Sequence, residues 1–228
     1  MSEVKVKTLG EFLQEWDVRM KDAYKQIPLF NLEMTKNWSD AQKTFFAKAF
    51  YHARGHFHDF LWFMGNHAPD ATAKRIVIDN ISEEFGIAKS HEQLYWEFAT
   101  SLGVDLKDEF LKEKTYLPFV REFNKGHIEW LTNHDWERCL SAFAAYERLD
   151  NLDYTELMKL AENMGISGRA LAFFQVHVYV EHFEAANKDV QRVWDKDQQK
   201  VIEAFDFIAE HQIKMWKGLS DIVFNYKG

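Results

Sequence analysis

The sequence predicts an all-α fold, a single bundle of about seven to nine helices spanning residues 1–228. Only 3 Pro and 10 Gly interrupt the 228 residues, which leaves room for long helices. Apolar side chains recur at helical spacing, and no segment shows the strict alternation of a half-buried strand. Hydrophobic residues make up 46% of the chain, enough for one sizeable core, so we expect one domain.

Helix signals divide the first half of the chain into four segments. Ser39 and Ser90 each stand three residues before a Gln, the spacing of a capping box at a helix start. Pro69 and Gly86 mark helix ends, because Pro lacks a backbone donor and Gly is a poor helix former. The expected helices cover residues 9–25, 39–66, 71–84 and 91–103.

In the second half, Pro118 is expected to bend or break a helical segment over residues 106–131. Asp153, with Glu156 three residues later, has the spacing of a helix start, and Gly165 should end the short helix that follows. The expected helices after this segment cover residues 136–149, 153–163, 167–187 and 189–224.

The charge balance argues against nucleic acid as a partner, and the distribution of apolar residues argues against a membrane. The chain has 36 acidic and 28 basic residues, a formal charge of −8, and its basic residues form no cluster. The amino terminus has no apolar signal region, and no stretch approaches the roughly 20 apolar residues of a membrane span. Cys139 is the only cysteine, which excludes an intrachain disulfide. We therefore expect a soluble, cytoplasmic protein.

Acidic and histidine residues at helical spacing indicate a candidate metal site. In the helix expected over residues 167–187, the side chains of His177, Glu181 and Glu184 fall within roughly 40° of one another and share one face. His182 points roughly 140° away from His177. Taken alone, such a stripe is more often a solvated polar face than a set of ligands.

Two other segments supply matching groups. Glu84 and His91 flank the break at Gly86, and Glu147 lies on or beside the buried stripe of the helix expected over residues 136–149. Diiron sites in helical bundles are built from carboxylates and histidines that several helices project inward. Carboxylate oxygens and imidazole nitrogens together suit iron or manganese better than a metal that prefers thiolates.

From about Phe45 to Ala186 these residues resemble the haem-oxygenase-like diiron oxidases and oxygenases, which bind no haem. The family pattern is a Glu and a His seven residues apart, a lone Glu on a middle helix, and a later His-x3-Asp/Glu-x2-His. Glu184 departs from it, since most members have His there, so we expect the second metal to be held more weakly. The resemblance implies as metal ligands Glu84, His91, Glu147 as the bridge, His177, Glu181 and Glu184.

The resemblance also implies an activity. Two Fe(II) ions, with manganese as the alternative, would activate O2 as co-substrate to oxidise a small molecule, most often a free amino acid or a derived amine in natural-product biosynthesis. N-oxygenation, C–C cleavage and nitrile formation all occur in the family. An external electron donor and a homodimer are compatible with this interpretation.

Two other function classes stay open. One is a metal-independent enzyme of the same helical architecture, such as a thiaminase-like hydrolase or a relative of the quinone-cofactor synthases. Glu84, Glu147 and Glu181 count against it, because those enzymes lack the full carboxylate set. The other is a non-catalytic helical interaction protein, which metal content after purification would distinguish.

Aromatic residues are abundant, with 20 Phe, 8 Trp and 8 Tyr, and helical spacing places most of them in the core. A subset near the candidate ligands could wall a substrate site. His52, His56 and His58 are expected to be polar groups on helix faces, and Cys139 a small packing residue. The candidate substrate-binding residues are Phe57, Tyr95, Phe173 and Phe174, with Arg54 as a cation for a carboxylate.

Overall fold

The structure is a computed structural model that describes residues 7–179 and 183–228, and for residues 183–185 only the backbone. All regular structure in these ranges is helical, which confirms the predicted class. The elements are α1 (Leu9–Tyr24), η1 (Pro28–Phe30), α2 (Leu32–Thr35), α3 (Asp40–Gly55), α4 (Phe57–His67), α5 (Ala71–Phe85), α6 (His91–Ser101), α7 (Lys107–Lys112), α8 (Pro118–Thr132), α9 (Trp136–Asn163), η2 (Gly168–Leu171), α10 (Ala172–Tyr179), α11 (Phe183–Lys196) and α12 (Gln198–Asn225).

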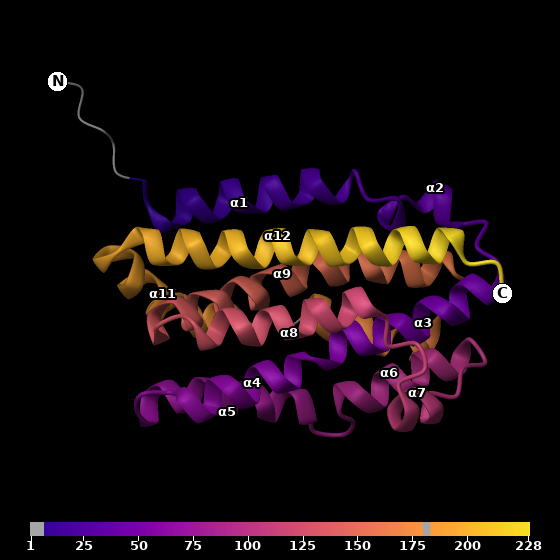
Figure 1. Cartoon of the computed structure of the whole chain (residues 1–228), viewed down its shortest axis with the longest axis horizontal. Coiled ribbons are helices and arrows are strands. Elements are labelled where there is room, and N and C mark those ends of the chain that lie inside the picture. Colours follow the sequence, from indigo (N-terminus) through magenta and orange to yellow (C-terminus); the bar gives the residue numbers. More distant parts are fainter. Residues whose placement is uncertain (1–6, 180–182) are drawn as a thin grey trace.

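Two long helices form the centre of the bundle. α9 and α12 have 28 residues each and pack along one another, and α1 follows α12 on its other side (Figure 1). α10 and α11 also pack on α9, whereas α4 and α5 form a pair against α8 and α6. α9 therefore runs through the middle of the molecule, where its inward residues meet side chains from several other helices.

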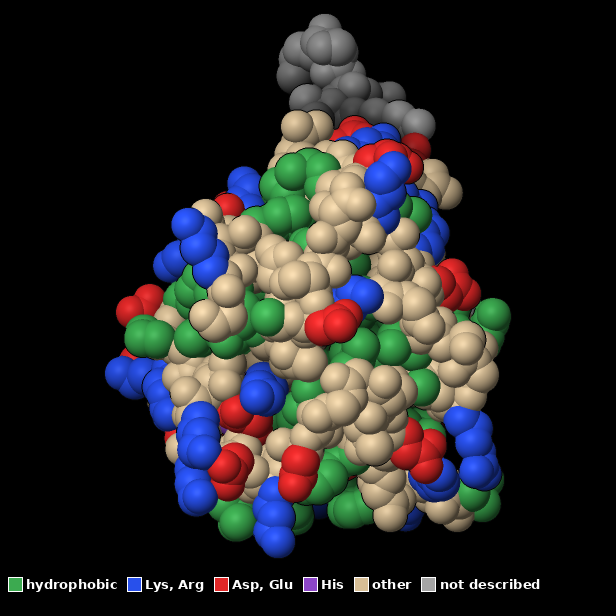
Figure 2. All heavy atoms as spheres, turned by 90° about the vertical axis from the view of Figure 1, so that its right-hand side faces the viewer, with side chains coloured by type: hydrophobic (Ala, Val, Ile, Leu, Met, Phe, Trp, Pro, Cys, Tyr) green, Lys and Arg blue, Asp and Glu red, His purple; other side chains and the backbone are tan. Residues whose placement is uncertain are grey.

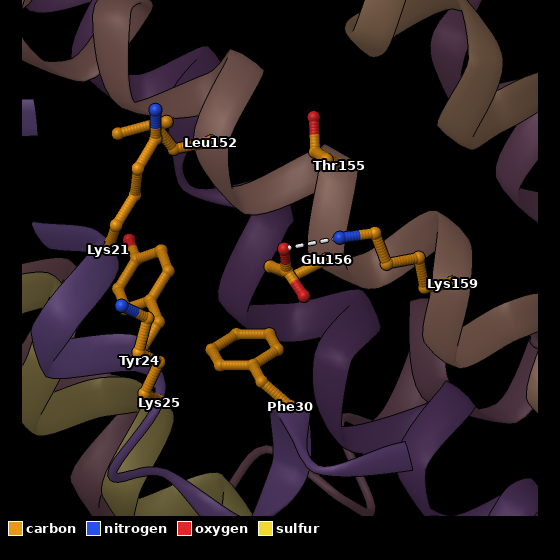
Figure 3. A pocket seen from close by; sticks show the side chains of 8 residues that line it. All are labelled: Lys21, Tyr24, Lys25, Phe30, Leu152, Thr155, Glu156 and Lys159. Carbon is orange, nitrogen blue, oxygen red and sulfur yellow. Dashed lines mark hydrogen bonds and ion pairs between the residues drawn. The ribbon is translucent and has the colours of Figure 1, made fainter.

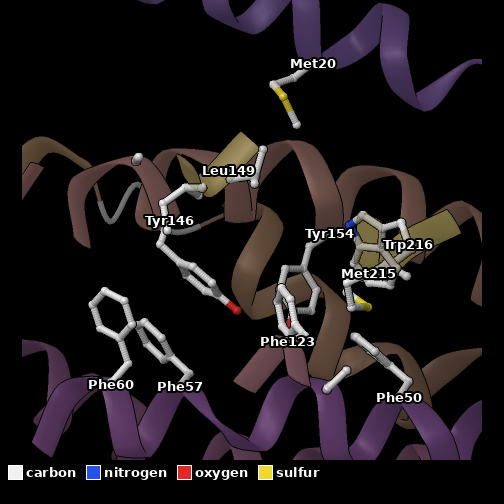
Figure 4. Close-up of a cluster of buried hydrophobic side chains, with 14 of the residues drawn as sticks. Met20, Phe50, Phe57, Phe60, Phe123, Tyr146, Leu149, Tyr154, Met215 and Trp216 are labelled. Carbon is white, nitrogen blue, oxygen red and sulfur yellow. The ribbon is translucent and has the colours of Figure 1, made fainter. Parts of the chain in front are cut away.

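The core between these helices is largely aromatic. Trp16 of α1 packs edge-on against Phe205 of α12 at a ring-centroid distance of 5.1 Å. Further along, Tyr146 of α9 stacks on Phe57 at 5.1 Å, beside Phe60 (Figure 4). Burying rings of this size is the main contribution of the core to stability.

The helix expected to start at Asp153 does not form as a separate unit. α9 continues without a break through this residue, so the predicted boundary at residues 149–153 is wrong. Asp153 is buried and accepts hydrogen bonds from the Tyr24 hydroxyl, Gln212 Nε2 at 2.6 Å and Trp216 Nε1 at 3.2 Å. Its partners lie on other helices, where a sequence pattern cannot place them.

The helix expected over residues 39–66 is divided instead. α3 ends at Gly55 and α4 begins at Phe57, with His56 between them. The His56 ring is buried, its Nδ1 donates to the Ala53 carbonyl, and it packs 4.7 Å from the ring of His127. Because the helix is divided here, the His56 ring points into the core. The first residues of α4 then lie beside the end of α5.

The surface carries mixed charge. On the end of the molecule drawn in Figure 2, basic and acidic side chains are interspersed among apolar and neutral ones. Within the described ranges, none of the helices is both long enough and apolar enough to cross a membrane.

Candidate metal centre

Glu84 and His91 are brought together by a tight turn between α5 and α6. Gly86 ends α5 with a positive φ of 61°, and a Cβ at this position would lie 2.2 Å from the Lys89 carbonyl oxygen. Ser90 then starts α6 with the predicted capping box, so that His91 is its first residue. As a result, His91 Nδ1 lies 2.9 Å from Glu84 Oε1.

His177 approaches the same point from α10. Its ring centroid lies 4.5 Å from that of His91, and Glu84, His91 and His177 each offer one ligand atom within 4.8 Å of the others. His177 Nδ1 donates to the Phe173 carbonyl at 2.7 Å, which leaves Nε2 as the nitrogen with a lone pair. Tyr154 stacks on the ring at 3.9 Å and holds its orientation.

Glu147 lies inside α9 and is 1% exposed. Burial raises the pKa of Glu147 well above its usual range, and the negative charge of Glu84 raises it further, against a hydrogen bond from Asn80. Burial acts on the pKa of Glu84 in the same direction, but hydrogen bonds from His58 and His91 hold that pKa well below its usual range. A cation between the two carboxylates would offset the cost of burying both charges.

Two further residues at this centre were not among the predicted ligands. Asp150 lies one helical turn after Glu147, and burial together with the charge of Glu147 raises its pKa well above the usual range. Three-residue spacing from Glu147 is the signal that could have found it. His58 of α4 brings Nε2 to 3.6 Å from Glu84 Oε2, a contact between helices that spacing alone does not reveal.

The remaining two predicted ligands are not placed. Glu181 lies outside the described residues, as does the side chain of Glu184. The structure thus brings together Glu84, His91 and His177, puts Glu147 and Asp150 within electrostatic range of Glu84, and leaves the later carboxylates as predictions.

Most predicted substrate residues pack in the core. The Tyr95 hydroxyl donates to the Ala47 carbonyl at 2.6 Å, and its ring meets Phe173 edge-on at 4.9 Å. Phe174 lies against Phe98 at the same distance. The guanidinium of Arg54 pairs with Glu92 at 2.7 Å and lies 5.0 Å from the Tyr95 ring centroid. Their substrate role remains a prediction, as does that of Phe57, which stacks on Tyr146.

Two pockets differ in their relation to this centre. One of 470 Å³ lies between α1 and α9, and the described part of its lining includes none of the candidate ligands (Figure 3). Its Lys159 and Glu156 pair with each other at 2.7 Å. The other, of 360 Å³, is lined by His58 and Glu92 and adjoins Glu84 through His58.

Comparison with known proteins identifies the family. Residues 44–215, about three quarters of the chain, match the family described as iron-containing redox enzymes. The chain belongs to this family. Members of the iron-containing redox enzymes are oxidoreductases, and a set of two histidines with carboxylates fits iron on chemical grounds.

Two solved structures are similar to this chain in fold. A domain of unknown function with a haem-oxygenase-like fold from Shewanella denitrificans has a TM-score of 0.73 at 15% identity, covering 96% of this chain and 93% of its own. A CADD-like protein of unknown function from Nostoc punctiforme has a TM-score of 0.72 at 18% identity, covering 92% and 99%. The protein therefore has a haem-oxygenase-like fold.

A curated relative resembles part of the chain in sequence. The 4-chloro-allylglycine synthase of Streptantibioticus cattleyicolor is 26% identical over 112 residues. The match spans 49% of this chain and 43% of the synthase, so less than half of that protein is compared.

Proposed function

We propose that this protein is a non-haem diiron enzyme that uses O2 to oxidise a small amine, a free amino acid or a compound derived from one. The observation that carries the proposal is the convergence of Glu84, His91 and His177 within 4.8 Å of one another, in a family of iron-containing redox enzymes. The similarity to a synthase whose product is an amino acid supports the substrate class.

The donor set suits iron. Glu84, His91 and His177 would hold one ion, and Glu147 would bridge it to a second ion held with Glu181 and Glu184. When bound, two ferrous ions would supply the electrons and the Lewis acidity for reaction with O2. Asp150 is a further oxygen donor close to this set, because the negative charges of Glu147 and Glu84 help to raise its pKa.

The chain's own residues prepare the centre before any metal arrives. The Phe173 carbonyl and the Tyr154 ring fix the tautomer and the plane of His177. The turn at Gly86 fixes the distance between His91 and Glu84. Because His91, His177 and Glu147 are buried, water has little access to the inner side of the centre, which strengthens electrostatic interactions there.

Anaerobic loading with Fe(II) followed by exposure to O2 tests this function. We expect O2 consumption that requires Fe(II) and rises with one class of compound in a panel of free amino acids, simple amines and fatty acids. His177→Ala should abolish it, whereas His67→Ala should leave it unchanged, because His67 is exposed and lies at the opposite end of α4 from His58, the residue that contacts Glu84. Fe(II)-loaded protein that consumes no O2 with any amine would contradict the proposal.

A further inference from the structure

The 360 Å³ pocket beside the candidate metal centre has an unusual lining. It lies where α3, α4, α6, α7 and α8 meet. His58 belongs to both the pocket and the metal centre, since its half-exposed ring lines the pocket and its Nε2 lies 3.6 Å from Glu84 Oε2. A molecule in this pocket would therefore be separated from Glu84 by one side chain.

The charge of the pocket is negative. The carboxylates of Asp59 and Glu92 line it, and its lining includes no Lys or Arg among the described residues. Glu92 is already engaged, because Arg54 donates to Oε2 at 2.7 Å and Tyr51 to Oε1 at 2.8 Å. Asp59 is exposed and forms no ion pair within the described part of the chain. Its charge is available to a ligand.

The walls leave room for a short apolar body. Phe110 of α7, a residue that is 64% exposed, lines the pocket, and its aromatic ring attracts both alkyl groups and cations. Gly55 lines it with no side chain, and a Cβ added there would meet nothing within 4 Å. The open space at Gly55 is therefore part of the volume that a ligand can fill.

We infer that this pocket is the substrate site and that it takes a small primary ammonium compound, with the ammonium group at Asp59 and the carbon chain against Phe110. His58 then lies between the bound compound and Glu84. That the occupant is a substrate rests on the proposed function, whereas the preference for a cation rests on the pocket alone.

Titration of metal-free protein with n-butylammonium, butyrate and n-butanol, followed by NMR, tests the charge preference. We expect n-butylammonium to bind at least about tenfold more tightly than either of the others. Asp59→Asn should weaken its binding about fivefold, the range of a partly exposed ion pair. Asp221→Asn, the same change on α12 outside the pocket, should not. Equal binding of the three probes, or an unaffected Asp59→Asn variant, would overturn the inference.

Filling the pocket tests its location. Gly55→Leu should abolish n-butylammonium binding, because the new side chain occupies the open space. Gly10→Leu is the matched control, since Gly10 is also helical and its Cβ would also meet nothing within 4 Å. Both variants should keep the wild-type melting temperature to within a few degrees. Binding that survives in a folded Gly55→Leu variant would place the ligand elsewhere.

A paramagnetic metal tests the link to the metal centre. In protein loaded with Mn(II), the NMR lines of bound n-butylammonium should broaden, as should the resonance of the His58 ring. Broadening of neither would show that the pocket is remote from the metal, and so overturn its role as the substrate site. Failure of Mn(II) and Fe(II) to bind at all would overturn the proposed function and the substrate role, but the cation preference measured in metal-free protein would stand.

Discussion

Asp153 is a buried carboxylate whose charge state is set by two opposing effects. Burial raises its pKa, while hydrogen bonds from Tyr24, Gln212 and Trp216 lower it, and the outcome is a pKa of about 7. Because this value lies above the ordinary pKa of an aspartate, the folded state binds the proton more tightly than the unfolded state. The contribution to stability is therefore fully present below about pH 4 and is lost as the pH rises through about 7.

Comparison with Asp153→Asn isolates this effect. Between pH 5 and pH 8 the free energy of unfolding of the wild type should fall relative to that of the variant by about 2–3 kcal/mol. The asparagine does not titrate. The informative quantity is therefore how the difference in free energy of unfolding between the two proteins changes with pH, and the size of that difference at any single pH is not used. Urea denaturation at several pH values measures it. Parallel curves for the two proteins would mean that Asp153 is ionised throughout this range.

At the scale of residues, part of the candidate metal site could be predicted from the sequence. Glu84, His91 and His177 could be named because their spacing matches a family pattern, and the structure places their side chains together. His58 could not be found this way, since its contact with Glu84 joins two different helices. The ion pair between Arg54 and Glu92 could not be predicted from the sequence either, because it depends on how α3 and α6 pack.

The turn that joins α5 to α6 is the element on which the metal centre depends most. Gly86 combines a positive φ with a close backbone approach to Lys89, and no side chain satisfies both conditions. The five residues from Gly86 to Ser90 set the separation of Glu84 and His91, which belong to different helices. A change at this glycine should therefore affect metal binding as well as stability.

Gly86→Ala should lower the melting temperature and weaken Fe(II) binding about tenfold or more, because the new Cβ would displace the turn. Gly103→Ala is a matched control, since Gly103 also has a positive φ but its Cβ would meet nothing within 4 Å. It should lose about 1 kcal/mol of stability and keep its affinity for Fe(II). Calorimetric titration measures both affinities. An equal affinity for Fe(II) in the two variants would show that metal binding does not depend on the geometry of this turn.

The elements themselves were predictable where the signal is local. Capping boxes at Ser39 and Ser90 and the break before Pro118 appear as expected. The prediction failed at Asp153, where a cap-like residue lies inside an unbroken helix because partners on α1 and α12 satisfy its carboxylate. It also failed near residue 189, since α11 continues to Lys196 and Asp197 caps the last helix.

At the scale of the whole molecule, the four candidate ligands whose side chains the structure describes lie on four different helices. Glu84, His91, Glu147 and His177 belong to α5, α6, α9 and α10; α10 packs on both α9 and α6, and α5 packs on α6. An ion bound by all four would tie these elements together. Since the unfolded chain offers no such arrangement, metal binding should stabilise the folded state.

The most direct test of this metal centre is the number of irons bound per chain at saturating Fe(II), measured by anaerobic equilibrium dialysis. We expect two in the wild type and none in Glu147→Ala, if that carboxylate bridges the ions. Glu156→Ala, on the same helix but with Lys159 as its ion-pair partner among the described residues, should still bind two. One iron or none in the wild type, or two in Glu147→Ala, would contradict a diiron centre bridged by Glu147.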